Sequence, residues 1–217
     1  LAATSAGAIV LASKGQTTTV IVLGDGATEP EKTAATELAA YLGKVTGAAF
    51  SIVDEAKAPT SGACVFVGNT QFARDNGVEA AKMGPEQWVM STVGDNLVLA
   101  GGRPRGTIYA VYRFLEDVVG VHWWNPFEES IPEMKSLSVD RLDVKGAPVF
   151  RYRDIYMLYG NDGGKFAARN RLNRQGDAGI DGAYGGDMGY GPPAHVHTFY
   201  TYFPPSEYSK DHAEWYS

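Results

Sequence analysis

The chain has 217 residues, of which 44% are hydrophobic, 12% aromatic and 20% charged, and its formal net charge is −6. This composition supports a folded core, and a net negative charge without a block of lysines and arginines argues against nucleic acid as a partner. No run of about 18 to 20 apolar residues is present, so no membrane span is predicted. A (β/α)8 barrel alone needs about 250 residues, which leaves room here for one small domain and part of another.

The first part of the chain alternates strand-like and helix-like segments. Residues 17–23 are rich in β-branched side chains and run into a Gly-Asp-Gly turn, which predicts a strand. A helix is predicted from Thr28 to Gly47, because Pro30 and acidic residues occupy its first turn and apolar residues follow at helical spacing. Two further strands and a short helix are predicted at residues 50–53, 63–68 and 71–76. The single cysteine, Cys64, lies in an apolar run and is expected to be buried.

A hairpin and a second helix are predicted next. Residues 87–93 and 96–100 flank a Gly-Asp pair, which is a hairpin signal. The second helix starts at Pro104 or Gly106 and runs to Val119, with Gly120 as its stop. A short strand at residues 121–124 and an edge strand within a proline-containing connector complete the segment.

The expected fold class is therefore α+β, with a mixed sheet and two helices packed on it. We place a domain boundary between residues 1–146 and 147–217, because the character of the sequence changes there. Val149 to Leu158 is predicted to form a strand rich in aromatics. A long Gly-rich region follows without clear periodicity, and Ser206 is predicted to cap a final helix.

Two stretches of sequence resemble known glycoside hydrolases. Residues 101–115 read GGRPRGTIYAVYRFL. This helix entry resembles the non-catalytic N-terminal domain that precedes the barrel in family 20 hexosaminidases and family 67 α-glucuronidases. Residues 147–157 read APVFRYRDIYM and are similar to the start of the first barrel strand in family 20. In that family an arginine grips sugar hydroxyls, and the resemblance gives this role to Arg153.

The end of the chain resembles one family more closely. Three segments carry the likeness, HTF at 197–199, FPPSEY at 203–208 and HAEWYS at 212–217. They are similar to a run in glycoside hydrolase family 163, a bacterial family long catalogued as a domain of unknown function. Ala213 replaces the proline that is usual there. The resemblance covers the N-terminal part of that family.

The resemblance implies an endo-β-N-acetylglucosaminidase-like hydrolase of GlcNAc-containing glycans, from an extracytoplasmic bacterial setting. Its partners are then a glycan and the remainder of the same polypeptide's barrel. Related barrels place their catalytic groups around the fourth strand, so we expect no catalytic residue in these 217 residues and no activity from them alone. Two alternatives remain open. One is a non-catalytic carbohydrate-binding or scaffolding module, and the other is an α-glucuronidase-like exo-hydrolase acting on xylan.

Four residues are candidates for substrate binding. Arg153 can donate to hydroxyls with its planar guanidinium, although an arginine beside an aspartate in a strand is also typical of a structural ion pair. His195 and His197 face the same side if extended, a spacing that can serve two ligands of a metal. The resemblance of the HTF segment implies instead that His197 forms hydrogen bonds to sugar. No third ligand stands at a recognisable offset, so we predict no metal and no cofactor. Asn170 shares a helical face with residues 173 and 174 if that segment is a helix, giving a donor surface or a solvated face.

Two further patterns have simpler explanations. Trp123 and Trp124 point in opposite directions in a strand, so at most one faces solvent and packing is the favoured role. Gly24 and Gly26 follow a strand and precede a helix, but the third glycine of a dinucleotide-binding loop is absent. They are interpreted as tight-turn glycines.

Overall fold

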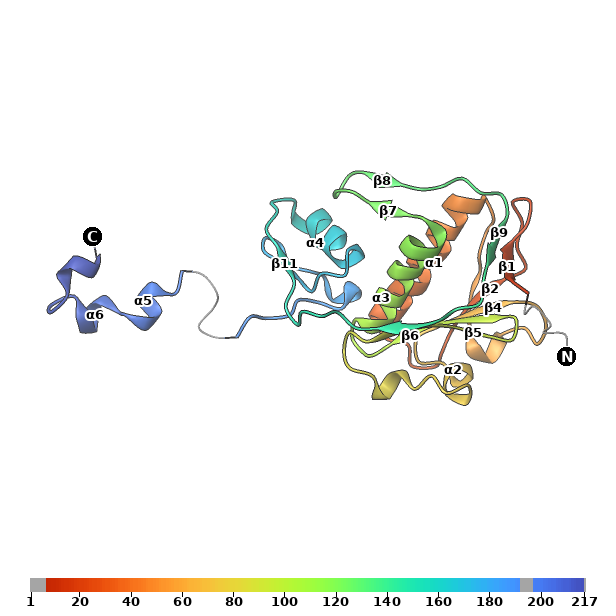
Figure 1. Ribbon diagram of the computed structural model, residues 1–217, viewed down its shortest axis with the longest axis horizontal. Helices are drawn as coiled ribbons and strands as arrows, with labels where there is room; N and C mark the ends of the chain where they lie inside the picture. The colour runs from red at the N-terminus through yellow and green to blue at the C-terminus, as the bar shows by residue number, and fades with distance from the viewer. Residues whose placement is uncertain (1–6, 192–196, 217) are drawn as a thin grey trace, which may run out of the picture. The chain divides into compact units, whose positions relative to one another are not determined.

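The computed structural model describes residues 7–191 and 197–216. It divides into two compact units, Leu1–Asp187 and Met188–Ser217. The first holds a six-stranded sheet with helices on both faces, which can be followed in Figure 1. The second holds the short helices α5 (Phe199–Tyr202), α6 (Pro205–Tyr208) and η5 (Ala213–Tyr216).

The six-stranded sheet confirms the predicted α+β class. Its strand order is β10-β5-β6-β4-β2-β3. Strands β3, β2, β4 and β6 run parallel, whereas β5 and β10 are antiparallel to their neighbours. The bounds are β2 Val20–Leu23, β3 Ile52–Asp54, β4 Cys64–Val67, β5 Trp88–Val93, β6 Asn96–Gly101 and β10 Asp143–Gly146. The predicted hairpin is confirmed as β5 and β6.

Helices α1 (Glu29–Thr46) and α3 (Gly106–Arg113) cover one face of this sheet, and α2 (Gln71–Asp75) lies on the other (Figure 1). The last turns after α3 form the π-helical segment η3 (Phe114–Val119), which ends at the left-handed Gly120. The start of α1 carries a capping box, in which the Thr28 backbone N–H donates to Oε2 of Glu31 at 2.7 Å.

The core lies between the sheet and these helices. Buried apolar side chains from α1, α3 and the strands form a continuous cluster on one face. A smaller cluster fills the opposite face under α2 and the short helix η2 (Ala80–Lys82). Every residue of β4 is buried because helices cover both of its faces, and Cys64 is 2% exposed, as predicted.

Two small sheets flank the large one. Strand β1 (Ile9–Ala12) pairs with β9 (Leu137–Val139), and β7 (His122–Trp123) pairs with β8 (Glu129–Ser130), both antiparallel. The Trp123 indole is buried and donates to the Tyr41 hydroxyl at 2.8 Å, whereas Trp124 is 64% exposed. The prediction that one tryptophan packs and at most one faces solvent is confirmed.

Three glycines set the junction between β6 and α3. A Cβ atom on Gly102 would collide with the carbonyl of Gly84, and one on Gly106 would collide with the carbonyl of Gln87. Gly101 is closed in by the backbone of Gly106. The junction therefore requires close approach of backbone to backbone, which glycine alone permits.

Residues 147–187 belong to the first compact unit and contain a strand–helix–strand motif. Strand β11 (Asp154–Ile155) is followed by α4 (Gly160–Arg169) and by β12 (Arg174–Gln175), which pairs with β11 in parallel. The predicted strand over 149–158 is wrong in extent, because Val149, Phe150 and Leu158 are largely exposed and the ladder spans two residues. Helix α4 was not predicted. The short helices η1 (Glu55–Lys57) and η4 (Gly182–Tyr184) lie elsewhere in this unit.

Helix α4 is attached to α1 by a charged contact. The Arg169 guanidinium donates from Nε and Nη2 to Oε2 of Glu37 at 3.0 and 2.9 Å. Both side chains are largely buried, 14% and 13% exposed. The strand–helix–strand motif is thus held firmly on the helical face of the large sheet.

In the second unit, aromatic rings surround the short helices. The His212 ring stacks on Trp215 with centroids 3.9 Å apart, and Phe203 meets Trp215 edge-on. The predicted cap is wrong, because Pro204 precedes α6 and Ser206 lies inside it. The helix begins at Pro205, whose missing N–H is harmless in a first turn.

Candidate functional site

A largely buried carboxylate, that of Glu86, connects the large sheet to residues 150–175. Oε1 of Glu86 accepts from Nε of Arg105 and from Nδ2 of Asn173, each at 2.8 Å. Oε2 accepts from Nη1 of Arg153 at 2.9 Å. Burial favours the neutral acid, but the hydrogen bonds from Arg153, Asn173 and Arg105 outweigh it and hold the pKa of Glu86 below its usual value. The carboxylate is therefore ionised at neutral pH and anchors two arginines.

Arg153 lies just before β11, and its guanidinium makes four hydrogen bonds to protein groups. Besides Glu86, its Nε donates to the carbonyl of Arg171 at 2.9 Å and its Nη2 to the hydroxyl of Tyr109 at 3.1 Å. The structural ion pair that the sequence left open exists, but its partner is Glu86 and not the neighbouring Asp154. Binding of sugar by Arg153 stays a prediction.

Asn170 and Arg153 line one shallow cleft of about 430 Å³. Asn170 follows the last residue of α4, and its side-chain amide donates to the carbonyl of Phe166 at 3.1 Å. The predicted helical face is wrong, because α4 ends before Asn173 and Arg174. Asn173 is fully buried against Glu86, and Arg174 stands in β12. The structure thus brings Arg153 and Asn170 together at one cleft, whereas Asn173 and Arg174 do not line it.

The predicted histidines belong to a different part of the chain. His197 is exposed in the second unit, two residues before the start of α5, and has a positive φ of 55°. His195 lies outside the described residues. Within residues 7–191 and 197–216, no three histidine, cysteine, aspartate or glutamate side chains come together as metal ligands.

The strand–helix–strand motif has two chemically different faces. Ile155 packs against α4, and the fully buried Gln175 lies beside Gly163 of that helix. Because side chains alternate along a strand, Asp154 and its cross-strand partner Arg174 point away from α4. The sequence did not reveal this pair, since the two residues are distant in the chain and meet through strand register.

Asp154 and Arg174 each contact a further polar side chain. Nη1 of Arg174 donates to Oδ2 of Asp187 at 2.7 Å, and the Tyr152 hydroxyl donates to Oδ2 of Asp154 at 2.8 Å. Partial burial and the contact with Asp154 raise the pKa of Tyr152 to about 12, so its phenol keeps the proton at neutral pH. The other oxygen of Asp154, Oδ1, is buried and has no hydrogen-bond partner among the described residues.

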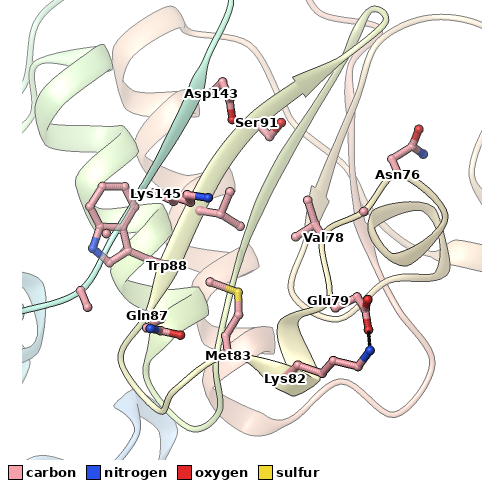
Figure 2. Close-up of a pocket in the computed structure, with 14 residues that line it drawn as sticks. Asn76, Val78, Glu79, Lys82, Met83, Gln87, Trp88, Ser91, Asp143 and Lys145 are labelled. Atoms are coloured by element: carbon pink, nitrogen blue, oxygen red, sulfur yellow. Dashed lines mark ion pairs between the residues drawn. The ribbon is translucent and has the colours of Figure 1, made fainter.

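A larger cleft, of about 700 Å³, lies at the edge of the six-stranded sheet. Figure 2 shows its two sides, one formed by β5 and β10 and the other by the segment that follows α2. Val78, Met83 and Val89 supply apolar surface. Polar side chains add hydrogen-bond donors and acceptors, namely Asn76, Gln87, Ser91, Asp143 and Lys145. Glu79 forms an ion pair with Lys82. Because the charges balance, the cleft suits a neutral polar ligand.

Solved structures of glycoside hydrolases share this fold. A family GH115 4-O-methyl-α-glucuronidase, BtGH115A, with specificity for decorated arabinogalactans, superposes with a TM-score of 0.57 at 18% identity, over 77% of this chain and 25% of its own. CpGH84D superposes with a TM-score of 0.52 at 15% identity, over 76% of this chain and 27% of its own. A mutant Streptomyces plicatus β-hexosaminidase in complex with its product GlcNAc has a TM-score of 0.49 at 12% identity. The match covers 79% of this chain and 32% of the hexosaminidase.

The TM-scores of BtGH115A and CpGH84D show a shared fold and, at these identities, no more than that. The chain spans a quarter to a third of the length of the three structures. No curated protein sequence matches the chain. Among the described residues, no helix has both the length and the apolar character that crossing a membrane requires. Residues 123–217 match the model of a protein family described as a domain of unknown function, DUF4838.

Proposed function

We propose that this chain is the N-terminal part of a bacterial, extracytoplasmic glycoside hydrolase that acts on GlcNAc-containing glycans. In this proposal residues 1–146 form a supporting domain, and residues 147–217 open the catalytic (β/α)8 barrel. The catalytic acid comes from later strands of the same polypeptide. The hydrolysis is of the endo-β-N-acetylglucosaminidase type.

The observation that carries the proposal is the parallel strand–helix–strand motif β11–α4–β12, seated on the helical face of the mixed sheet. Parallel strands joined through a helix are the repeating unit of a (β/α)8 barrel. Glu86 and the pair of Glu37 with Arg169 fix that unit to the first domain through buried charges. The fold shared with the GH115 and GH84 proteins supports the same order of domains.

A substrate panel with the full-length gene product tests this proposal. We expect release of a GlcNAc-terminated product from N-glycans and from a chromogenic β-GlcNAc glycoside, and no release by residues 1–217 alone. Cleavage of 4-O-methylglucuronoxylan or arabinogalactan in place of these substrates would favour the α-glucuronidase alternative. Absence of hydrolysis from every substrate would contradict the proposal.

The cleft in Figure 2 favours a second candidate function, non-catalytic carbohydrate binding. Its volume lies in the range of ligand sites, about 300 to 1,000 Å³, and its polar groups fit a neutral sugar. Residues 1–217 should then bind GlcNAc oligosaccharides in isothermal titration, and the double change Ser91→Ala and Lys145→Ala should weaken binding about tenfold or more. Lys57→Ala, which changes an exposed lysine that does not line the cleft, is the matched control. A flat titration of the unaltered chain would exclude this function.

A further inference from the structure

Oδ1 of Asp154 has no hydrogen-bond partner among the described residues, which points to a missing ligand. Buried polar atoms in folded proteins nearly always have a hydrogen-bond partner, because leaving water without one costs free energy. Oδ2 of Asp154 accepts the Tyr152 hydroxyl, whereas Oδ1 is buried without a partner among the described residues. Oδ1 is therefore a strong acceptor whose donor is missing among the described residues.

The location of Asp154 indicates where such a molecule would lie. Ile155 and Gln175 face α4, so Asp154 and Arg174 occupy the side of β11 and β12 that carries no helix. Parallel sheets are almost always covered on both faces. In a (β/α)8 barrel the helix-free side of the strands is the interior, where ligands are bound at one end.

Charge and donor pattern narrow the ligand further. Nη1 of Arg174 donates one hydrogen bond to Asp187, and the guanidinium has four more N–H donors. The site therefore contains the acceptor Oδ1 of Asp154 and the N–H donors of Arg174. Its charged groups are two carboxylates, Asp154 and Asp187, and one guanidinium. An excess of negative charge disfavours an anionic group such as a uronate. A hydroxyl can donate to Asp154 and accept from Arg174 at the same time.

We propose that Asp154 and Arg174 bind the hydroxyl groups of a neutral sugar ring, with Asp187 positioning Arg174 and Tyr152 positioning Asp154. This inference rests on the proposed function, since it places the sugar inside the barrel that β11 and β12 begin. Asp154 contributes the acceptor and Arg174 the donor. Asp154, Arg174 and Asp187 do not line the cleft of Arg153.

Equilibrium binding to the full-length gene product tests the inference. The probes are GlcNAc and its monodeoxy analogues, titrated into the unaltered protein, Asp154→Asn and Arg174→Gln, with hydrolysis measured in parallel. We expect each change to weaken GlcNAc binding about tenfold or more, as for the loss of a hydrogen bond to a charged group. One deoxy analogue should bind the unaltered protein and Asp154→Asn equally, because the hydroxyl that Asp154 holds is already gone. Asp162→Asn, exposed on α4, should leave binding unchanged.

Every outcome of this binding experiment either supports or overturns the proposed sugar site. Equal GlcNAc affinity of Asp154→Asn and the unaltered protein would overturn the inference, as would no measurable binding of GlcNAc to the unaltered protein. An equal loss for GlcNAc and every deoxy analogue, accompanied by a lower melting temperature, would assign Asp154 a structural role and also overturn it. Binding with the expected pattern but without hydrolysis would uphold the site and reject the proposed hydrolase.

Discussion

Replacing Glu86 with glutamine is expected to lower the free energy of unfolding by about 3 kcal/mol or more, because it leaves buried arginines without their counter-charge. Glu86, Arg105 and Arg153 are 11%, 7% and 15% exposed at their side chains, so water cannot compensate. The amide that replaces the carboxylate also points N–H groups at arginine donors. Urea denaturation of residues 1–217 at pH 7 measures the change.

The matched control for this change is Glu79→Gln. Glu79 also forms an ion pair, with Lys82, but both side chains are more than half exposed. Exposed pairs contribute little, so we expect a change below about 0.5 kcal/mol. Equal losses from the two substitutions would show that Glu86 is an ordinary surface charge, contrary to the geometry.

The effect of Glu86→Gln should depend on pH in a defined direction. The pKa of Glu86 in the folded chain lies below the usual 4.5, so the unfolded chain takes up the proton first as the solution is acidified. The stability due to Glu86 is thus fully present above about pH 4.5 and disappears as pH falls through the folded pKa. The difference between unaltered chain and variant should narrow below that pH, and a difference that widens would contradict the assignment.

Gly106→Ala is expected to lower the free energy of unfolding by about 3 kcal/mol or to prevent folding, the upper end for overpacking a tight site. The new Cβ would collide with the carbonyl oxygen of Gln87 and with the backbone of Gly101. Backbone atoms cannot rotate away as a side chain can, so β6 and α3 must separate. Thermal melting followed by circular dichroism measures the loss.

Gly182→Ala is the control for that substitution. A Cβ on Gly182 meets nothing within 4 Å, and Gly182 lies in the short helix η4. Alanine favours helical backbone, so the melting temperature should stay the same or rise slightly. If Gly106→Ala melted like Gly182→Ala, the close approach of backbone to backbone at the junction would be refuted.

The sequence predicts the first domain well where local signals agree with tertiary packing. The first long helix has an early proline, acidic residues in its first turn and a C-terminal glycine, and its bounds follow from them. The hairpin of β5 and β6 follows from the turn at Gly94 and two apolar arms. In both, the side chains that form the pattern are the ones that become buried.

Residues 147–187 were harder to predict because pattern and packing disagree there. Val149, Phe150 and Leu158 suggest a buried strand but are largely exposed. Helix α4 contains Gly160, Gly163 and Gly164, which have low helix propensity. A Cβ on Gly164 would strike the carbonyl of Gly179, so this glycine permits close packing, which a periodicity argument cannot detect.

The candidate site depends on long-range geometry in the same way. The sequence resemblance of residues 147–157 points to Arg153, and the structure adds its partner Glu86, which stands before β5 and belongs to no motif. Asp154 and Arg174 are brought opposite each other by the parallel register of β11 and β12. A pairing of this kind needs the strand ladder itself and cannot be derived from residue spacing.

An experimental structure of the full-length gene product with GlcNAc bound tests the central claim most directly. We predict that β11 and β12 are the first two strands of a closed parallel barrel and that residues 1–146 lie outside it without touching the sugar. We also predict a sugar hydroxyl within hydrogen-bond distance of Oδ1 of Asp154. A structure in which β11 and β12 join no further parallel strand, or in which GlcNAc binds away from their helix-free face, would contradict the account.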